Sequence, residues 1–302
     1  MSPGIPLQAI VIAVVIHALW GGNPVAVKFS LLVFPPMWTA FLRFAIAIVC
    51  VAVWAWYRGI RFWPNRREWP LLFGLGILFT VQIAAMNIGF DLTSGAMSSV
   101  LISTNPLFAA FLAHFIIARD RMSTVKAMGL IVALLGVSLV LLRDARLAEL
   151  QLINLGNWIV LLSAALLGLR LVLSAKMLEQ TDEVRVVVWQ MVISLPLFAA
   201  GGWLWETIHW ENLAWGPVAG IAYQGFVVAG LGFMVLSYLM KKYTPSVMMS
   251  FNFVAPVAGV LLSVWLLAET VSALLIAGLV LVGMGLYLIA RPAAPPARQD
   301  GH

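Results

Sequence analysis

The sequence has few charged residues and a single cysteine, and both shortages exclude whole classes of protein. Charged side chains make up 10% of the 302 residues and apolar ones 63%, whereas about a quarter of a soluble domain is charged. Cys50 has no second cysteine with which to form a disulfide or a thiolate metal site. Apolar runs recur from residue 7 to residue 290 with short polar breaks, which leaves no room for a separate soluble domain. The sequence therefore predicts an integral membrane protein whose functional site lies among its helices.

Motifs for enzymatic chemistry and for direct use of ATP are also missing. The chain contains no Walker A sequence, no H-E-x-x-H and no G-x-S-x-G. We therefore expect no enzyme, no metal site and no cofactor, with an intramembrane enzyme as the less favoured alternative.

The breaks between apolar runs predict ten membrane-spanning helices, over residues 7–33, 36–57, 69–90, 93–117, 125–142, 156–178, 185–205, 214–240, 245–267 and 271–290. An even number places both termini on one side, where thirteen Lys and Arg fall, against three on the other side. Positive residues are retained in the cytoplasm, so we expect a multi-pass cytoplasmic-membrane protein with both termini cytoplasmic. The formal charge of +6 then reports topology rather than binding of nucleic acid. The Pro-rich tail, residues 291–302, is expected to be a disordered cytoplasmic segment.

The two halves of the chain resemble each other. The matched pairs are Pro106 with Pro256, Asp120 with Glu269, Gly129 with Gly278, Gly136 with Gly285, and Lys28 with Lys176. Because each half has five helices, the second must cross the membrane in the opposite sense to the first. The expected fold is all-α, with ten helices in two inverted five-helix repeats over residues 1–145 and 146–290. Two such halves can alternate between an inward-open and an outward-open cavity.

Three features of the sequence resemble one family of membrane proteins. They are LWGGNPVAVK at residues 19–28, PPMWTAFLRF at residues 35–44, and the duplicated pattern of proline, acid and glycine. Together they are similar to the drug/metabolite transporter superfamily, in its ten-helix EamA-type branch. The resemblance implies a monomeric or weakly associated secondary transporter that exports small metabolites, often amino acids, through a central cavity in the lipid bilayer. A nucleotide-sugar or drug carrier of the same superfamily is the alternative.

The positions of the acidic residues narrow the expected solute. All twelve fall in expected loops, in the tail or at helix ends. Efflux of organic cations generally uses a buried carboxylate that holds either a proton or the drug. The sequence therefore favours a neutral, zwitterionic or anionic solute, unless His17 or His114 carries a proton.

The first expected helix contains a stripe of small and polar residues and a weak point. His17, Gly21, Pro24 and Lys28 recur at helical spacing, which is typical either of a cavity lining or of a packing face. The run from Gly21 and Gly22 through Asn23 to Pro24 should weaken the helix, as a hinge or as a harmless kink.

Paired prolines mark the fourth and ninth expected helices. Pro106 and Pro256 each deprive a carbonyl four residues earlier, at Ile102 and Asn252, of its helical donor. Because one kink falls in each half, we favour a gating role. Ser99 and Asn252 lie beside these kinks and are expected to contact substrate, although small hydroxyls also allow close helix packing.

The remaining candidates are polar residues inside other expected helices. Gln82, and Tyr223 with Gln224, offer hydrogen bonds to a polar solute. A buried guanidinium suits a carboxylate, so Arg170 is the candidate anchor, with internal contacts to backbone carbonyls as the alternative. Arg43 is interpreted mainly as structural, and Lys28 is a secondary candidate. The expected substrate-binding set is His17, Asn23, Gln82, Ser99, Arg170, Tyr223 and Asn252, and the expected hinge set is Gly21, Gly22, Pro24, Pro106 and Pro256.

Overall fold

The computed structural model describes residues 6–60, 63–117, 122–147, 154–177, 181–243 and 250–290, and all regular structure in these ranges is helical. The main elements are α1 (Leu7–Gly21), α2 (Asn23–Leu31), α3 (Pro36–Tyr57), α4 (Trp69–Leu92), α5 (Gly95–Ile102), α6 (Asn105–Ile116), α7 (Thr124–Leu147), α8 (Leu155–Met177), α9 (Glu183–Trp205), α10 (Trp215–Ala222), η2 (Tyr223–Leu231), α11 (Gly232–Lys242), η3 (Ser250–Phe253), α13 (Val254–Leu267) and α14 (Ala273–Ala290). A short 3-10 turn, η1 (Trp210–Asn212), precedes α10.

The all-helical membrane fold predicted from the sequence is confirmed. Among the described residues, nine helical segments are long and apolar enough to cross a membrane. They correspond to nine of the ten expected helices, with ends that differ by a few residues. The remaining expected helix, over 245–267, is described only from residue 250, and its part Phe251–Leu267 is a shorter apolar helix. The expected disordered tail and Asp120 lie outside the described residues.

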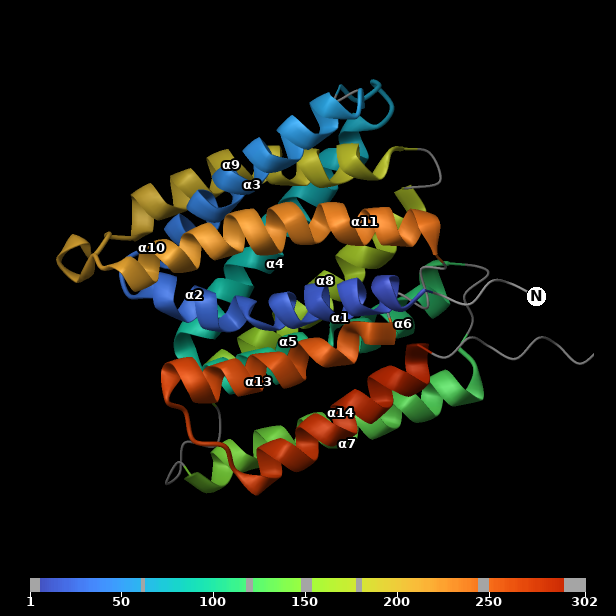
Figure 1. The fold of residues 1–302 in the computed structure, drawn as a ribbon, viewed down its shortest axis with the longest axis vertical. Helices are drawn as coiled ribbons and strands as arrows, with labels where there is room; N and C mark the ends of the chain where they lie inside the picture. The colour runs from blue at the N-terminus through green and yellow to red at the C-terminus, as the bar shows by residue number, and fades with distance from the viewer. Residues whose placement is uncertain are drawn as a thin grey trace, which may run out of the picture.

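The helices lie side by side in one bundle (Figure 1). The pair α7 and α14 packs together at one edge, and α3 packs on α9 at the opposite edge. Between them, α4 packs on α8, while α10 packs on α2 and η2 on α3. Contacts of α13 with α1 and of α6 with α8 complete the interior. These reciprocal contacts between the two halves are those that two inverted repeats would make.

Glycines matched between the halves lie against each other in the pair α7 and α14. A Cβ on Gly129 would lie 2.8 Å from the Gly285 carbonyl oxygen, and one on Gly136 would lie 2.7 Å from the Gly278 carbonyl oxygen. Small residues let membrane helices approach until their backbones touch. Because lipid is as apolar as the helix surface, van der Waals contact at this close approach is what holds the two helices together. These four glycines therefore hold the edge of the bundle rather than line a cavity.

Four of the expected helices are not continuous α-helix in the part that the structure describes; in the ninth, the 3-10 segment η3 precedes α13. The first breaks at Gly22, between α1 and α2, and the fourth breaks at Ser103 and Thr104, between α5 and α6. The residues that follow, Asn23-Pro24 and Asn105-Pro106, start the next segment, where proline needs no donated backbone hydrogen bond. In the eighth helix, η2 is a π-helical segment, a geometry often found at functional sites.

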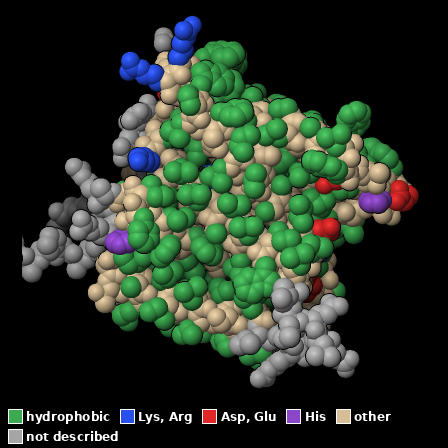
Figure 2. All heavy atoms as spheres, turned by 180° about the vertical axis from the view of Figure 1, so that it is seen from behind, with side chains coloured by type: hydrophobic (Ala, Val, Ile, Leu, Met, Phe, Trp, Pro, Cys, Tyr) green, Lys and Arg blue, Asp and Glu red, His purple; other side chains and the backbone are tan. Residues whose placement is uncertain are grey.

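The surface is apolar along the bundle and charged at its two ends (Figure 2). We call the end that carries Asp91, Glu206, Glu211 and Glu269 the acidic end. The opposite end, with Arg58, Arg66, Arg67, Lys176 and Lys242, is the basic end. The first described residue of α1 lies at the basic end.

Candidate functional site

Arg43 is buried inside the bundle on α3. Only 5% of its surface is exposed, and its Cζ lies 4.4 Å from the ring centroid of Phe44. Its Nη1 donates a long hydrogen bond of 3.4 Å to Oε1 of Gln224. The amide of Gln224 in turn donates to Ser30 Oγ at 2.8 Å. Arg43 is thus held by neutral groups on α2 and η2.

Arg170 is held in the same manner on α8. Its Nη1 donates to Oε1 of Gln190 at 2.9 Å, and its Cζ lies 4.8 Å from the ring centroid of Phe79. Gln190 reaches Ser174 Oγ with its own amide at 3.5 Å. The predicted anchor is therefore inside the bundle, and its observed partners are an amide and a ring rather than backbone carbonyls.

A pair of phenylalanine rings joins the two arginines into one cluster. Phe44 and Phe79 meet edge to face with centroids 4.8 Å apart, and Phe198 stacks on Phe44 at 6.0 Å. In the described part of the chain, no acidic side chain pairs with either arginine, and both Nε atoms are buried without a partner. We call these two arginines and the rings of Phe44 and Phe79 the central cluster.

Gln82 lies in the packed interface between α4 and α8. Its amide donates to Ser163 Oγ at 3.1 Å, and the Ser163 hydroxyl donates back to the Gln82 carbonyl at 2.9 Å. The side-chain Oε1 of Gln82 is buried without a partner. One acceptor therefore stays available inside the bundle.

Hydrogen bonds join the first expected helix, beside its break at Gly22, to the eighth expected helix. Tyr223 Oη donates to the Leu19 carbonyl at 2.5 Å, and Trp20 Nε1 donates to the Val228 carbonyl in η2 at 3.2 Å. His17 is fully buried and its Nδ1 donates to Ala13 O at 2.8 Å, while its Nε2 has no partner. Asn23 has a buried Oδ1 without a partner. The predicted stripe is thus packed at His17, which retains one polar atom without a partner, and the neighbouring Asn23 retains another.

The predicted hinge residues divide between packing and helix breaks. A Cβ on Gly21 would collide with the Ala255 carbonyl oxygen, and one on Gly259 would collide with the Ser99 hydroxyl, so α13 touches α1 and α5 closely. Gly22 separates α1 from α2, directly before Asn23-Pro24.

The two proline kinks differ. The Ile102 carbonyl, deprived of its helical donor by Pro106, accepts instead from Asn105 Nδ2 at 2.9 Å. Pro256 lies in the first turn of α13, with partly exposed Asn252 before it on η3.

Carboxylates close the acidic end by binding helix N-termini. Glu269 accepts the backbone N–H groups of Gly95 and Ala96 at 2.6 and 2.9 Å. Glu206 binds the N–H groups of Met37 and Trp38 in the first turn of α3, at 2.9 to 3.1 Å. A carboxylate at a helix N-terminus is stabilised by the hydrogen bonds and by the helix dipole. These contacts tie the end of α13 to α5, and the end of α9 to α3.

Asp91 and Lys28 also lie at the acidic end, near these carboxylate contacts. Burial, with the nearby charge of Asp91, raises the pKa of Glu206, and the two backbone hydrogen bonds oppose that rise. Lys28 Nζ donates to the Asp91 carbonyl at 3.2 Å. Lys28 therefore lies at the acidic end, whereas Arg170 lies fifteen residues of α8, or about 22 Å, from that end. The structure does not bring these two cations together, as a shared phosphate site would require.

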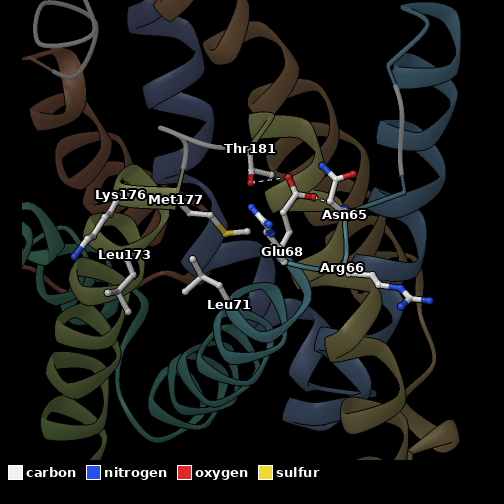
Figure 3. A pocket seen from close by; sticks show the side chains of 9 residues that line it. Asn65, Arg66, Glu68, Leu71, Leu173, Lys176, Met177 and Thr181 are labelled. Carbon is white, nitrogen blue, oxygen red and sulfur yellow. Dashed lines mark hydrogen bonds between the residues drawn. The ribbon is translucent and has the colours of Figure 1, made fainter.

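A cavity of about 700 Å³ opens at the basic end between α4 and α8 (Figure 3). Leu71, Leu173 and Met177 line its apolar wall, while Arg66 and Lys176 contribute charge at its edge. Leu173, on the cavity wall, follows Arg170 by one helical turn of α8.

The acid of this cavity is already neutralised. Glu68 pairs with Arg185 at 2.9 Å and accepts hydrogen bonds from Thr181 and from the Asn65 backbone. Burial opposes ionisation of Glu68, but these hydrogen bonds and the charge of Arg185 hold its pKa below the usual value. The cavity therefore presents the positive charge of Arg66, Arg67 and Lys176.

Sequence reasoning missed several residues of this arrangement. Gln190, like Gln82, is a polar residue within an apolar helix. The reasoning that selected Gln82 could therefore have selected Gln190 as well. Glu206 looked like an ordinary loop acid and Glu269 was noted only as the repeat partner of Asp120, because nothing in the sequence shows which distant N-terminus a carboxylate binds. The contact of Phe44 with Phe79 has no sequence signal among sixteen phenylalanines.

The apolar bundle, the broken helices and the polar groups held at its centre define a multi-pass membrane protein of the transporter class. The sequence matches the EamA-like transporter family over residues 7–142 and again over residues 154–291, so the chain belongs to this family. An uncharacterized transporter of Archaeoglobus fulgidus is 29% identical over 277 residues, which cover 90% of this chain and 95% of that protein. A probable amino-acid metabolite efflux pump of Salmonella typhimurium is 25% identical, covering 92% and 93% of the two chains. A crystal structure with a TM-score of 0.66 and 20% identity covers 93% of this chain and 96% of its own, and shows the same fold.

Proposed function

We propose that this protein exports small polar metabolites, amino acids first, across the cytoplasmic membrane by alternating access. The observation that carries this proposal is Arg170: a guanidinium inside the bundle, bound to a neutral amide, with its Nε unpartnered and no described acid beside it. Such a group is unfavourable in a membrane protein unless it serves a pathway. A substrate carboxylate would occupy its free donors in a forked arrangement. The efflux pump of Salmonella typhimurium, similar over nearly the whole chain, supports amino-acid metabolites as the cargo class.

The gates of this transporter are the two ends of the bundle. Carboxylates bind helix N-termini at the acidic end, while the basic end holds the cavity whose wall includes Leu173, one helical turn from Arg170. With both termini in the cytoplasm, as the charge distribution predicts, this arrangement is an inward-facing form closed to the outside. Residues 1–145 and 146–290 act as the two inverted repeats, and their exchange of shapes opens the acidic end.

The breaks in the first and fourth helices supply the bending. Gly22 and Pro24, with Pro106 and Pro256 in the paired helices, leave segments that can tilt without breaking a continuous hydrogen-bond ladder. Gln82, Tyr223, His17, Asn23, Ser99 and Asn252 orient the substrate once it reaches the interior.

Counterflow in liposomes tests this proposal. Purified protein should exchange a labelled amino acid against preloaded unlabelled solute and return it chemically unchanged, whereas an enzyme would alter it. Arg170→Ala should reduce carboxylate exchange by about 30-fold or more, because it removes the charged partner of a desolvated pair. Undiminished exchange by this variant would remove Arg170 from the site. Absence of exchange for every member of an amino-acid panel, with and without a pH gradient, would overturn the transport proposal.

A further inference from the structure

We propose that the central cluster selects solutes with two acidic groups, such as a dicarboxylate or a dicarboxylic amino acid, with one group held by Arg43 and the other by Arg170. This inference rests on the proposed function and adds the charge of its substrate.

The first argument is that two separate sets of donors are available. Each arginine has its own ring and its own amide: Phe44 and Gln224 for Arg43, Phe79 and Gln190 for Arg170. A guanidinium carries five N–H donors, and each of these uses one Nη for its amide. Both Nε atoms are buried and unpartnered. Donors for one carboxylate therefore remain on each arginine.

The second argument is the missing negative charge. The carboxylate of Glu68 pairs with Arg185 at the basic end of the bundle, away from its centre. At the centre, the guanidinium groups of Arg43 and Arg170 lie on the rings of a phenylalanine pair, with no described carboxylate to offset their charge. A neutral amino acid would bring one carboxylate, together with an ammonium group for which the central cluster offers no acidic partner. A solute with two acidic groups brings one negative charge for each of the two arginines. We therefore expect the central cluster to select such solutes over neutral amino acids.

The third argument is the route from the basic end. Arg66, Arg67 and Lys176 surround the cavity, and its acid Glu68 is neutralised by Arg185. A cleft lined by one sign of charge concentrates solutes of the opposite sign. Leu173 on its wall lies one turn from Arg170. Positive charge therefore lies at the mouth of the cavity, on Lys176, and deeper along the same helix α8, on Arg170.

Counterflow with three labelled solutes tests this selection. Succinate has two acidic groups, aspartate has two acidic groups and an ammonium, and alanine has one of each. The proteins compared are the wild type, Arg43→Gln, Arg43→Lys and the control Lys242→Gln, whose lysine lies at the basic end over the rings of Tyr238 and Tyr243. Gel filtration and helical content establish that each variant folds.

We expect the wild type to exchange succinate and aspartate at least tenfold faster than alanine. Arg43→Gln should lower succinate and aspartate exchange by about 30-fold while leaving alanine within about threefold, because alanine has one carboxylate and Arg170 can hold it. Arg43→Lys, which retains the charge, should restore part of the flux, and Lys242→Gln should match the wild type.

Three results would overturn the inference. The first is exchange of alanine as fast as that of the other two solutes, and the second is an equal reduction of all three by Arg43→Gln. The third is exchange of alanine that depends on chloride, which would then supply the second negative charge, with no flux of succinate or aspartate. In each case alanine exchange leaves the proposed function standing. Exchange of no solute at all would remove both proposals.

Discussion

Glu269→Gln should open the acidic end of the protein. Glu269 receives two backbone N–H bonds, from Gly95 and Ala96 at 2.6 and 2.9 Å. A hydrogen bond to a charged group contributes about 1.5 to 3 kcal/mol, against about 1 kcal/mol for a neutral one. Glutamine keeps one neutral acceptor and loses the favourable charge at the N-terminus of α5. The closed state should therefore lose about 2 to 3 kcal/mol, which changes the ratio of closed to open by about 30- to 150-fold.

Thiol labelling measures this change. Ser263 on α13 is fully buried, and its Oγ lies 2.8 Å from where a Cβ on Gly95 would be. A cysteine there, in a Cys50→Ser background, becomes reachable only when α13 and α5 separate. A membrane-impermeant maleimide added at the acidic-end face should label Ser263→Cys about 30-fold faster or more when Glu269→Gln is also present.

A matched acid at the same end provides the control. Glu211 is exposed and bonded through its side chain to His209 at 3.2 Å. Glu211→Gln should leave the labelling rate unchanged. An unchanged rate in Glu269→Gln, or an equal rise in both variants, would refute the reasoning that the Glu269 contact holds this end closed.

Further predictions follow from the packing and from the ion pair at the basic end. Glu68→Gln should lower the free energy of unfolding by about 2 to 3 kcal/mol, because it removes the carboxylate that pairs with largely buried Arg185 at 2.9 Å; thermal unfolding in detergent measures this. Because the pKa of Glu68 is depressed in the folded protein, its stabilisation is complete above the usual pKa near 4.5 and is lost as the pH falls through the lower folded value. The wild type should therefore lose thermal stability over that range more steeply than Glu68→Gln does, and equal slopes would contradict the assignment. Gly21→Ala should destabilise by about 1 to 3 kcal/mol through the collision with Ala255, whereas Gly283→Ala, with nothing within 4 Å, should not destabilise.

The fold could be predicted well from the sequence because one physical pattern determines it. Apolar runs of membrane length, separated by charge or by proline and glycine, place nine of the ten helices within a few residues. The breaks at Gly22 and before Pro106 could also be predicted, because proline removes a backbone donor wherever it stands. The π-helical segment η2 could not be predicted, because it depends on how the eighth helix packs against α3.

The site could be predicted only in part. Arg170 was found because a guanidinium inside an apolar run is unfavourable in any membrane fold. Arg43 carried the same signal and was interpreted as structural, since the sequence does not show that Phe44 and Phe79 bring α3 and α8 into one cluster. Lys28 was a secondary candidate beside Arg170, and the fold separates the two by most of the depth of α8.

The measurement that tests the account most directly is whether positions on the two sides of the bundle become reachable in turn. Leu173 on α8 lines the cavity at the basic end, whereas Ser98 on α5 is fully buried one turn from the acidic-end start of its helix. We predict that, in the Cys50→Ser background, Leu173→Cys reacts with an impermeant maleimide from the basic-end face. Adding Glu269→Gln should slow that reaction and make Ser98→Cys reactive from the acidic-end face. Unchanged reactivity of both positions when Glu269→Gln is added would contradict alternating access.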